Sequence, residues 1–294
     1  MENIDAWVNR AKNNEDQKLR QAIHLILLAI SRDKSLSQTL ALKGGLMLAI
    51  VYSSDRYTSD IDLSLLENAQ KMSKESLQDT LEKQLKAVVA ISNYDLELMV
   101  QSIQDRPKRN PTKATFPAYK LKIGYADIKK PNAVKQLKNK QSANIIEIDV
   151  SFNESVSVYD IECFKLEGKY NVLCYTLEQL VAEKYRSVLQ QEVRNRNRRQ
   201  DIYDLYYLLD CEIDSLSTDE TKKTVLNKLL KSASGRGIDD YLHSKAMQDE
   251  AIKTRSLEDF NTLLQEIDIK PDASSHEMYD KVKKYFESLP WNDS

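Results

Sequence analysis

The stretch that decides the fold runs from residue 42 to residue 63 and reads LKGGLMLAIVYSSDRYTSDIDL. From residue 60 to residue 66 polar and apolar residues alternate, which predicts a β-strand. Successive side chains on a strand point to opposite faces, so Asp60 and Asp62 project from one face about 7 Å apart along the chain. Two neighbouring carboxylates repel each other, and a divalent cation between them relieves that repulsion. The pair therefore predicts a metal site.

Two glycines precede these acids. Gly44 and Gly45 open an apolar stretch, residues 42–52, that predicts a short helix. Glycine lets the backbone approach a ligand closely, and the unsatisfied N–H groups at a helix N-terminus attract phosphate. Arg56 lies between the glycines and the acids and is a further candidate for binding phosphate. The stretch therefore predicts a nucleotide phosphate beside the metal.

A second acidic strand is expected at residues 144–152, which read NIIEIDVSF. Its apolar residues alternate with Glu147 and Asp149, which places the two acids on the same face. Asp149 is nearer the end of the strand, where the chain leaves the sheet, and it is the favoured third carboxylate. Together with Asp60 and Asp62 it would complete a site for two metal ions.

Prolines and apolar periodicity predict the remaining layout. Four of the six prolines lie from Pro107 to Pro131 and none follows until Pro271, so the first half should be rich in strands and loops and the second half helical. Helices are expected at 4–31, 72–90, 177–191, 199–210, 217–234, 255–267 and 275–288, and further strands at 95–104 and 118–125. We expect an α+β fold. Residues 1–165 would form a mixed sheet flanked by helices, and residues 166–294 a helical domain that completes the active site.

Charge is unevenly distributed in a chain of 294 residues whose net charge is only -2. From Arg106 to Lys140 there are eleven basic residues and one acid, and a second basic run, RNRNRR, occupies residues 194–199. Local basic runs on a nearly neutral protein indicate a polyanionic partner, either nucleic acid or a triphosphate.

Other features exclude several classes of function. No apolar run approaches the roughly 18 residues that cross a bilayer, so no membrane partner is expected. The cysteines, Cys163, Cys174 and Cys211, are odd in number and widely spaced, which favours a reducing cytoplasm over disulfides or a zinc site. The three histidines are scattered, which leaves little for histidine-based catalysis.

A second candidate cluster lies in the helical half. Lys184 falls on the apolar stripe of a predicted helix, where a lysine either extends to water or meets a buried anion such as a nucleoside triphosphate. Asp201 and Asp204 are three residues apart on the next helix and are therefore neighbours on its surface. They could pair with Arg198 or Lys184, or orient the lysine or the incoming nucleophile.

Together these segments resemble the AbiEii/AbiGii nucleotidyltransferase toxins of bacterial abortive-infection and type IV toxin–antitoxin systems. That family is a branch of the nucleotidyltransferase superfamily with the polymerase-beta-like fold. The matching pieces lie within residues 40–210 and are KGG at 43–45, Arg56 with DIDL at 60–63, LVAEK at 180–184 and RQDIYDLY at 199–206. The Asp-x-Asp pair alone is generic, and the two later segments make the resemblance specific.

The resemblance implies metal-dependent transfer of a nucleotide from an NTP to an acceptor hydroxyl, with release of pyrophosphate. The two acids of the first strand, with Asp149, would hold two Mg²⁺ ions. Many relatives have a hydroxyl residue where this chain has Leu46. Thr58 or Ser59 is the candidate substitute for that contact with phosphate.

The helical residues receive roles from the same resemblance. Lys184 would contact the nucleotide phosphates. Asp201, which follows the arginine-rich run, would be the catalytically required aspartate, with Asp204 as the alternative.

The resemblance also implies partners. The acceptor would be RNA, with the 3′ end of tRNA as the favoured target, and residues 106–140 would grip its backbone. Modified tRNA would block translation and growth, as phage defence requires. An antitoxin encoded nearby would not need to bind directly. The alternatives are an enzyme that modifies a protein or a small molecule, a non-catalytic nucleotide-binding regulator, and a structural interaction protein built on the helical half.

Overall fold

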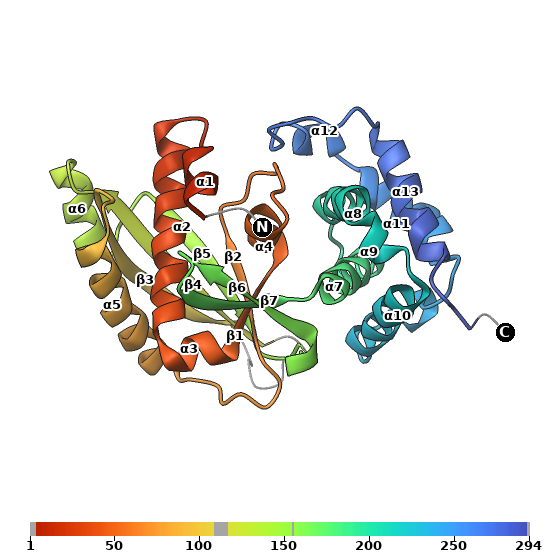
Figure 1. Ribbon diagram of the computed structural model, residues 1–294, viewed down its shortest axis with the longest axis horizontal. Coiled ribbons are helices and arrows are strands. Elements are labelled where there is room, and N and C mark those ends of the chain that lie inside the picture. The colour runs from red at the N-terminus through yellow and green to blue at the C-terminus, as the bar shows by residue number, and fades with distance from the viewer. Residues whose placement is uncertain (1–3, 109–116, 155, 293–294) are drawn as a thin grey trace. The chain divides into compact units, whose positions relative to one another are not determined.

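The computed structural model describes residues 4–108, 117–154 and 156–292. The chain divides into two compact units, the first made of Met1–Ser53 and Thr58–Cys174 and the second of Ser54–Tyr57 and Tyr175–Ser294 (Figure 1). The first unit contains the sheet, and the second contains the helices that follow it. The expected α+β class, with a mixed sheet followed by a helical region, is confirmed. The sheet continues past residue 165, through two further strands.

Seven strands form the sheet in the order β3-β4-β5-β2-β1-β7-β6. Their bounds are β1 Leu40–Lys43, β2 Ile61–Leu65, β3 Leu96–Arg106, β4 Ala118–Asp127, β5 Ile145–Ser151, β6 Ile161–Leu166 and β7 Tyr170–Tyr175. Strand β2 runs parallel to β5 and antiparallel to β1, while β4 is antiparallel to both β3 and β5. The central strands β2 and β5 therefore run in the same direction, and their C-terminal ends lie at the same end of the sheet.

Alternating burial explains the central strands. On β5, Ile146, Ile148 and Val150 are buried, whereas Glu147 and Asp149 between them are half-buried. On β2, Ile61 and its alternate neighbours are likewise buried. One face of the sheet is thus apolar, and the opposite face carries the acidic side chains.

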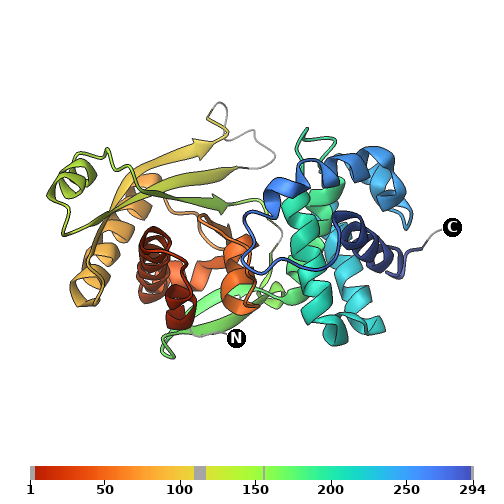
Figure 2. The same cartoon turned by 90° about the horizontal axis from the view of Figure 1, so that it is seen from above.

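Within the described residues of the first unit, six α-helices accompany the sheet. They are α1 Ile4–Asn9, α2 Asn14–Arg32, α3 Lys34–Thr39, α4 Gly44–Val51, α5 Lys74–Ile91 and α6 Pro131–Lys138. Helix α2 packs against α5, and α5 packs on β3 (Figure 2). Three of these helices follow residues whose side chains cap them. The Asn13 side chain accepts from the Asp16 N–H at 2.9 Å, Asp33 from the Leu36 N–H at 3.0 Å and Ser73 from the Ser76 N–H at 3.1 Å. Helix α4 begins at the glycine pair, as the sequence predicts.

Several elements differ from the expectations. In place of one helix at 255–267 the structure has α11 Glu250–Leu257 and α12 Phe260–Leu263, and the short helix α3 has no counterpart among the expected elements. Strand β1 is buried along all four residues and therefore lacks alternation, so its end was assigned to the following helix. Helix α6 begins with Pro131 in its first turn, a position that tolerates proline, but the proline-rich context indicated a loop. Strands β6 and β7 were not predicted. Residues 109–116 of the expected basic loop lie outside the described residues.

The second unit is helical. Its helices are α7 Leu177–Leu189, α8 Arg199–Cys211, α9 Ile213–Leu216, α10 Asp219–Ala233, α11 Glu250–Leu257, α12 Phe260–Leu263 and α13 Ser275–Glu287. Short 3₁₀ turns, η3 Asp239–Tyr241 and η4 Ala246–Gln248, join some of them, and a similar turn, η2 Val158–Asp160, precedes β6 in the first unit. Helix α7 packs on α10 and α8 on α13.

Tyrosine hydroxyls bind backbone carbonyls inside this helical unit. The buried Tyr185 hydroxyl donates to the Val282 carbonyl at 2.9 Å, and the Tyr279 hydroxyl donates to the Met247 carbonyl at 2.7 Å. A buried phenol needs such a partner, since leaving it without one costs free energy. These bonds fix α13 against α7 and against the η4 turn.

Residues 54–57 belong to the helical unit although the chain reaches them early. The Tyr57 N–H donates to the Glu266 carbonyl at 2.7 Å, and the Asp268 N–H donates to the Asp55 carbonyl at 3.1 Å. Arg56 forms an isolated antiparallel bridge with Ile267. Residues 54–57 are thus part of the second unit, although strand β2 of the first unit begins only a few residues later.

None of the helices in the described part of the chain combines the length and the apolar character that crossing a bilayer requires.

Replacing Ile148 by alanine should lower the free energy of unfolding by about 2–5 kcal/mol, because the side chain is 1% exposed at the centre of β5. Ile91→Ala removes the same atoms from a side chain that is 62% exposed, and should change stability by less than about 0.5 kcal/mol. Urea unfolding monitored by circular dichroism measures both. Similar losses in the two variants would contradict this description of the core.

Candidate active site

Strand pairing places four charged residues in one row across the sheet. Asp62 on β2 pairs with Lys43 on β1 and with Asp149 on β5, and Asp149 in turn pairs with Lys120 on β4. Directly paired residues point to the same face of a sheet. Lys43, Asp62, Asp149 and Lys120 therefore form what we call the charged row.

Gly44 follows the charged row at the start of α4. Its φ of +71° lies in the left-handed region, which favours glycine. A Cβ atom built there would collide with the Asp62 carboxylate. Two independent constraints therefore require glycine at this position, and one of them is the close approach of the backbone to Asp62. Gly45 continues α4, whose first turn has no side-chain cap.

Asp60 lies just before β2 and is exposed, whereas Asp62 is half-buried. The hydroxyl of the buried Thr58 donates a hydrogen bond to Asp60 Oδ1 at 3.1 Å. The two residues that the sequence assigned separately to metal and to phosphate are thus in contact. Thr58 orients the Asp60 carboxylate from within the same short connection.

The electrostatics of the row favour a bound cation. Burial raises the pKa of Asp149, and the carboxylates of Glu147 and Asp60 add to that rise, while Lys120 and Arg106 oppose it. The pKa of Glu147 is lowered because it accepts from Lys120 at 2.5 Å and pairs with Lys122 at 3.3 Å. An added positive charge would therefore stabilise the ionised form of Asp149.

The donor set suits a hard divalent cation, because Asp60, Asp62 and Asp149 offer only carboxylate oxygens. Backbone pairing brings Asp62 and Asp149 side by side, and Asp149 senses the charge of Asp60. Among the described residues, however, no three histidine, cysteine or acidic side chains form a group that could hold a metal ion. The backbone thus aligns carboxylates of the right chemistry, and their side chains do not form a common group of three.

A buried ionic cluster forms in the helical unit around Asp204. Arg56 binds both oxygens of this carboxylate, with Nε at 2.8 Å and Nη2 at 3.0 Å. Lys184 donates to Asp204 at 2.6 Å and to Asp201 at 3.2 Å. Arg198 lies 3.6 Å from Asp201. Of the two alternatives for Lys184, extension to water or a buried anion, the structure has the second, and the carboxylates of Asp204 and Asp201 are the anions that it meets.

Charges within this cluster stabilise one another. Burial alone would raise the pKa of Asp204, but the charges of Arg56 and Lys184 outweigh it and hold that pKa below its usual value. Burial alone would lower the pKa of Lys184, but Asp204 and Asp201 outweigh it and raise that pKa. Both groups are therefore charged at neutral pH.

The structure separates the two aspartates on α8. The Asp204 side chain is 1% exposed and bound by two cations, whereas the Asp201 side chain is 15% exposed. A carboxylate that must meet substrate needs an accessible oxygen. Asp201 retains some access, and Asp204 holds Arg56 and Lys184 in place.

Sequence reasoning did not recognise Lys43 as a site residue. Its side chain is buried, lies 3.5 Å from Glu154 and shares a face with Asp62. Lys43 does belong to the Lys-Gly-Gly segment of the resemblance. That its side chain shares a face with Asp62 follows only from the strand β1, which the sequence pattern does not predict. Lys43 adds a positive charge beside the acids.

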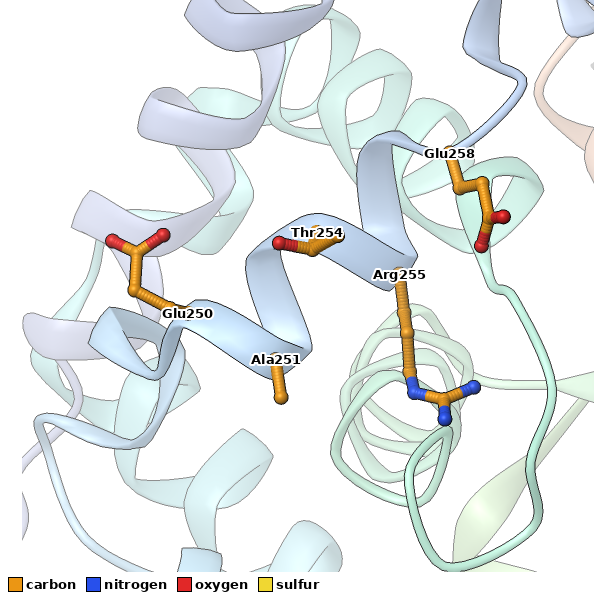
Figure 3. A pocket seen from close by; sticks show the side chains of 5 residues that line it. All are labelled: Glu250, Ala251, Thr254, Arg255 and Glu258. Atoms are coloured by element: carbon orange, nitrogen blue, oxygen red, sulfur yellow. The ribbon is translucent and has the colours of Figure 1, made fainter.

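A pocket with a volume of about 480 Å³ lies along α11 (Figure 3). Its lining residues are Glu250, Ala251, Thr254, Arg255 and Glu258. None of the site residues predicted from the sequence is among these described lining residues, so the pocket is distinct from both clusters.

The arrangement is typical of a nucleotidyltransferase. It has paired acids on a mixed sheet, a glycine turn in contact with one of them, and a helical unit with a buried lysine. The sequence matches the family model described as nucleotidyl transferase AbiEii toxin of a type IV toxin–antitoxin system over residues 26–287. The chain therefore belongs to the AbiEii nucleotidyltransferase toxin family, and it is a nucleotidyltransferase. A comparison with curated protein sequences gave no match.

Solved structures share the fold at low sequence identity. A nucleotidyltransferase candidate from H. pylori has a TM-score of 0.52 and 13% identity, over 94% of this chain and 95% of that one. JHP933 from Helicobacter pylori has a TM-score of 0.50 and 12% identity, over 94% and 92%. The nucleotidyltransferase toxin MenT4 from Mycobacterium tuberculosis has a TM-score of 0.46 and 14% identity, over 98% and 99%. The two H. pylori structures support the fold.

Gly44→Ala should destabilise the protein more than Gly168→Ala. Both glycines have a left-handed φ, of +71° and +66°, so each alanine costs about 1–2 kcal/mol of backbone strain. Only at Gly44 does the new Cβ also meet Asp62, since nothing lies within 4 Å of a Cβ at Gly168. Urea unfolding of the two variants separates the contact from the strain. Equal losses of unfolding free energy in the two variants would show that the contact with Asp62 adds nothing to the cost of the substitution.

Asp204→Ala should cost about 3–5 kcal/mol of unfolding free energy, because it leaves Lys184 and Arg56 without their buried counter-charge. Asp201→Ala should cost less, since Lys184 keeps Asp204 and the removed carboxylate is partly exposed. Chemical unfolding at pH 7 measures both. A larger loss for Asp201→Ala would reverse the assignment of the supporting role.

Proposed function

We propose that this enzyme transfers a nucleotide from an NTP to the 3′ end of an RNA, with tRNA as the favoured acceptor, in a Mg²⁺-dependent reaction. Translation and growth would then stop, as a toxin of phage defence requires. The observation that carries the proposal is the pairing of Asp62 with Asp149 beside the Gly44 turn. Membership of the AbiEii family supports it.

The acids of the first unit would hold the metal. Asp60, Asp62 and Asp149 are the carboxylates with suitable chemistry, and Thr58 holds Asp60 by its hydrogen bond. A bound pair of Mg²⁺ ions would neutralise charge on the triphosphate and lower the pKa of the acceptor hydroxyl. The hydroxyl would release its proton to solvent while its oxygen bonds to the α-phosphorus. The bond from the α-phosphorus to the oxygen that bridges it to the β-phosphorus would break, and that oxygen would leave with the electron pair as part of pyrophosphate.

The start of α4 would bind the phosphates. Lys43 precedes this helix without capping it, so N–H groups of the Gly44–Gly45 turn can meet an anion. Glycine at 44 lets the backbone come close to Asp62 and therefore close to anything that Asp62 binds. Lys43, on the same face, adds a positive charge for the triphosphate.

In the helical unit, Lys184 and Asp201 remain the proposed functional pair. Lys184 stays protonated because Asp204 and Asp201 raise its pKa. Its ammonium would contact phosphate from within the cluster, and Asp204 with Arg56 would fix its position. We thus favour Asp201 as the required aspartate and assign Asp204 to positioning.

The RNA acceptor is proposed from charge. Within residues 106–140, helix α6 and its flanks carry several exposed lysines, including Lys130 and Lys140. Others are partly neutralised, since Lys138 lies 3.5 Å from Glu97 and Lys129 pairs with Asp95. The exposed lysines suit the phosphate backbone of RNA, whose binding is largely electrostatic.

Incubation with total RNA, Mg²⁺ and each radiolabelled NTP in turn should label small RNA with one preferred nucleotide. Asp60→Asn and Asp62→Asn should reduce labelling to background and abolish growth inhibition, because each removes a metal-binding charge. The exposed Asp79→Asn on α5 is the matched control and should retain activity.

The same assay decides between the acceptors. Label found on protein or on a small molecule would replace RNA as the acceptor. Labelling that persists in the Asp60→Asn/Asp62→Asn double variant would refute the mechanism. No transfer to any acceptor, together with Mg²⁺-dependent NTP binding, would indicate a regulatory protein.

A further inference from the structure

The second basic run is so far without an assigned role, apart from Arg198, which lies 3.6 Å from Asp201. Residues 186–199 contain five arginines and one acid, Glu192. They span the end of α7 and the connection to α8. We call residues 190–198 the arginine loop. All of these residues lie in the helical unit, as does Arg236 in the turn after α10.

Buried amide groups fix the arginine loop. Gln190 is 1% exposed and donates to the Arg236 carbonyl at 3.1 Å, and it accepts from Arg186 at 2.7 Å. Gln191 is completely buried and donates to Ser256 and to the Ile252 carbonyl on α11. Buried amide donors that are hydrogen-bonded restrain the backbone that carries them. The loop is therefore tied to the turn after α10 and to α11.

Guanidinium groups crowd on this rigid support. Burial lowers the pKa of Arg194, and the charges of Arg186, Arg198, Arg196 and Arg236 lower it further, to about 10. In addition, the buried Nε atoms of Arg186 and Arg198 have no hydrogen-bond partner among the described residues. Glu183 lies 3.2 Å from Arg186 and Asp201 lies 3.6 Å from Arg198, so carboxylates of the chain offset part of this charge. The crowded guanidinium groups would be stabilised further by a bound anion.

The space beside the loop is accessible. Asn197 donates to Glu258, the residue that follows α11, at 2.7 Å, so the loop borders the pocket described above. Figure 3 shows Glu250 and Glu258 at opposite ends of that pocket, with Arg255 extending between them toward the green ribbon of the α7–α8 region. The two carboxylates disfavour an anion inside the pocket, whereas Arg196 of the loop is exposed and open to an anion from solvent.

We propose that the arginine loop, together with Arg236, binds phosphate groups of the RNA acceptor. Guanidinium is planar and offers paired donors, which match phosphate oxygens. Arg196 is exposed and Arg194 and Arg198 are half-buried, so the cations are spread along the loop, as successive phosphates of one strand require. This assignment rests on the proposed RNA acceptor, and a free NTP is the competing source of phosphate.

Binding of a labelled tRNA, measured without NTP over a range of salt concentrations, tests the proposal. The triple variant Arg194→Gln/Arg196→Gln/Arg236→Gln should bind at least tenfold more weakly at low salt. The slope of log affinity against log salt should fall by about 2, from about 0.7 for each lost phosphate contact to single-stranded nucleic acid. Lys222→Gln/Lys223→Gln/Lys270→Gln removes the same charge elsewhere in the unit and should change affinity less than twofold.

A second arm measures binding of a fluorescent NTP to the same variants. Loss of tRNA binding with unchanged NTP binding supports the proposal. Loss of NTP binding alone, no loss of either, or an equal effect of the lysine control would overturn it. If the glutamine triple variant unfolds, the exposed Arg196→Gln should still weaken tRNA binding and lower the salt slope by about 0.7. A triple arginine-to-lysine variant keeps the charge and should therefore keep the salt slope.

The test is independent of transfer. Asp60→Asn/Asp62→Asn should still bind tRNA in a manner that depends on the arginines. If the unaltered protein fails to label RNA, the proposed function fails while the arginine dependence of tRNA binding can still be measured.

Discussion

Backbone hydrogen bonding between β1, β2 and β5 fixes the register on which the rest of the first unit depends. It sets Lys43, Asp62 and Asp149 on one face, and the opposite face of β2 and β5 is buried apolar surface. A shift of one residue would turn the acids into the core and expose Ile61 and Ile148. The cost of burying carboxylates and exposing isoleucines therefore protects the arrangement of the site.

The glycine turn adds a second constraint to this register. Because Gly44 approaches Asp62 without a side chain, the start of α4 is held against the acidic strand. This close approach of Gly44 also brings the N–H groups at the start of α4 near the Asp62 carboxylate. The turn thus combines groups suited to an anion and to a cation.

The sequence was informative where local periodicity and burial agree. Strand β5 alternates strictly, so its acidic face could be predicted, and α4 was located by its glycines and apolar residues. Strand β1 could not be recognised, since four consecutive buried residues have no distinguishing period. Consequently the position of Lys43 beside Asp62 was missed. The difference between Asp201 and Asp204 was also inaccessible, because it depends on Arg56, which is distant in sequence and binds only Asp204 of the two.

Residues 54–57 belong to the helical unit although they are synthesised long before its helices, and this has a consequence for folding during synthesis on the ribosome. These residues pair with Glu266 and Asp268, which are made more than two hundred residues later. Arg56 likewise can pair with Asp204 only after that residue has been synthesised. The segment that leads into Asp60 therefore acquires all of these partners only after residue 268 has been synthesised. For a toxin, this order of events postpones assembly of the connection to the acidic strand until the helices of the second unit up to that residue have left the ribosome.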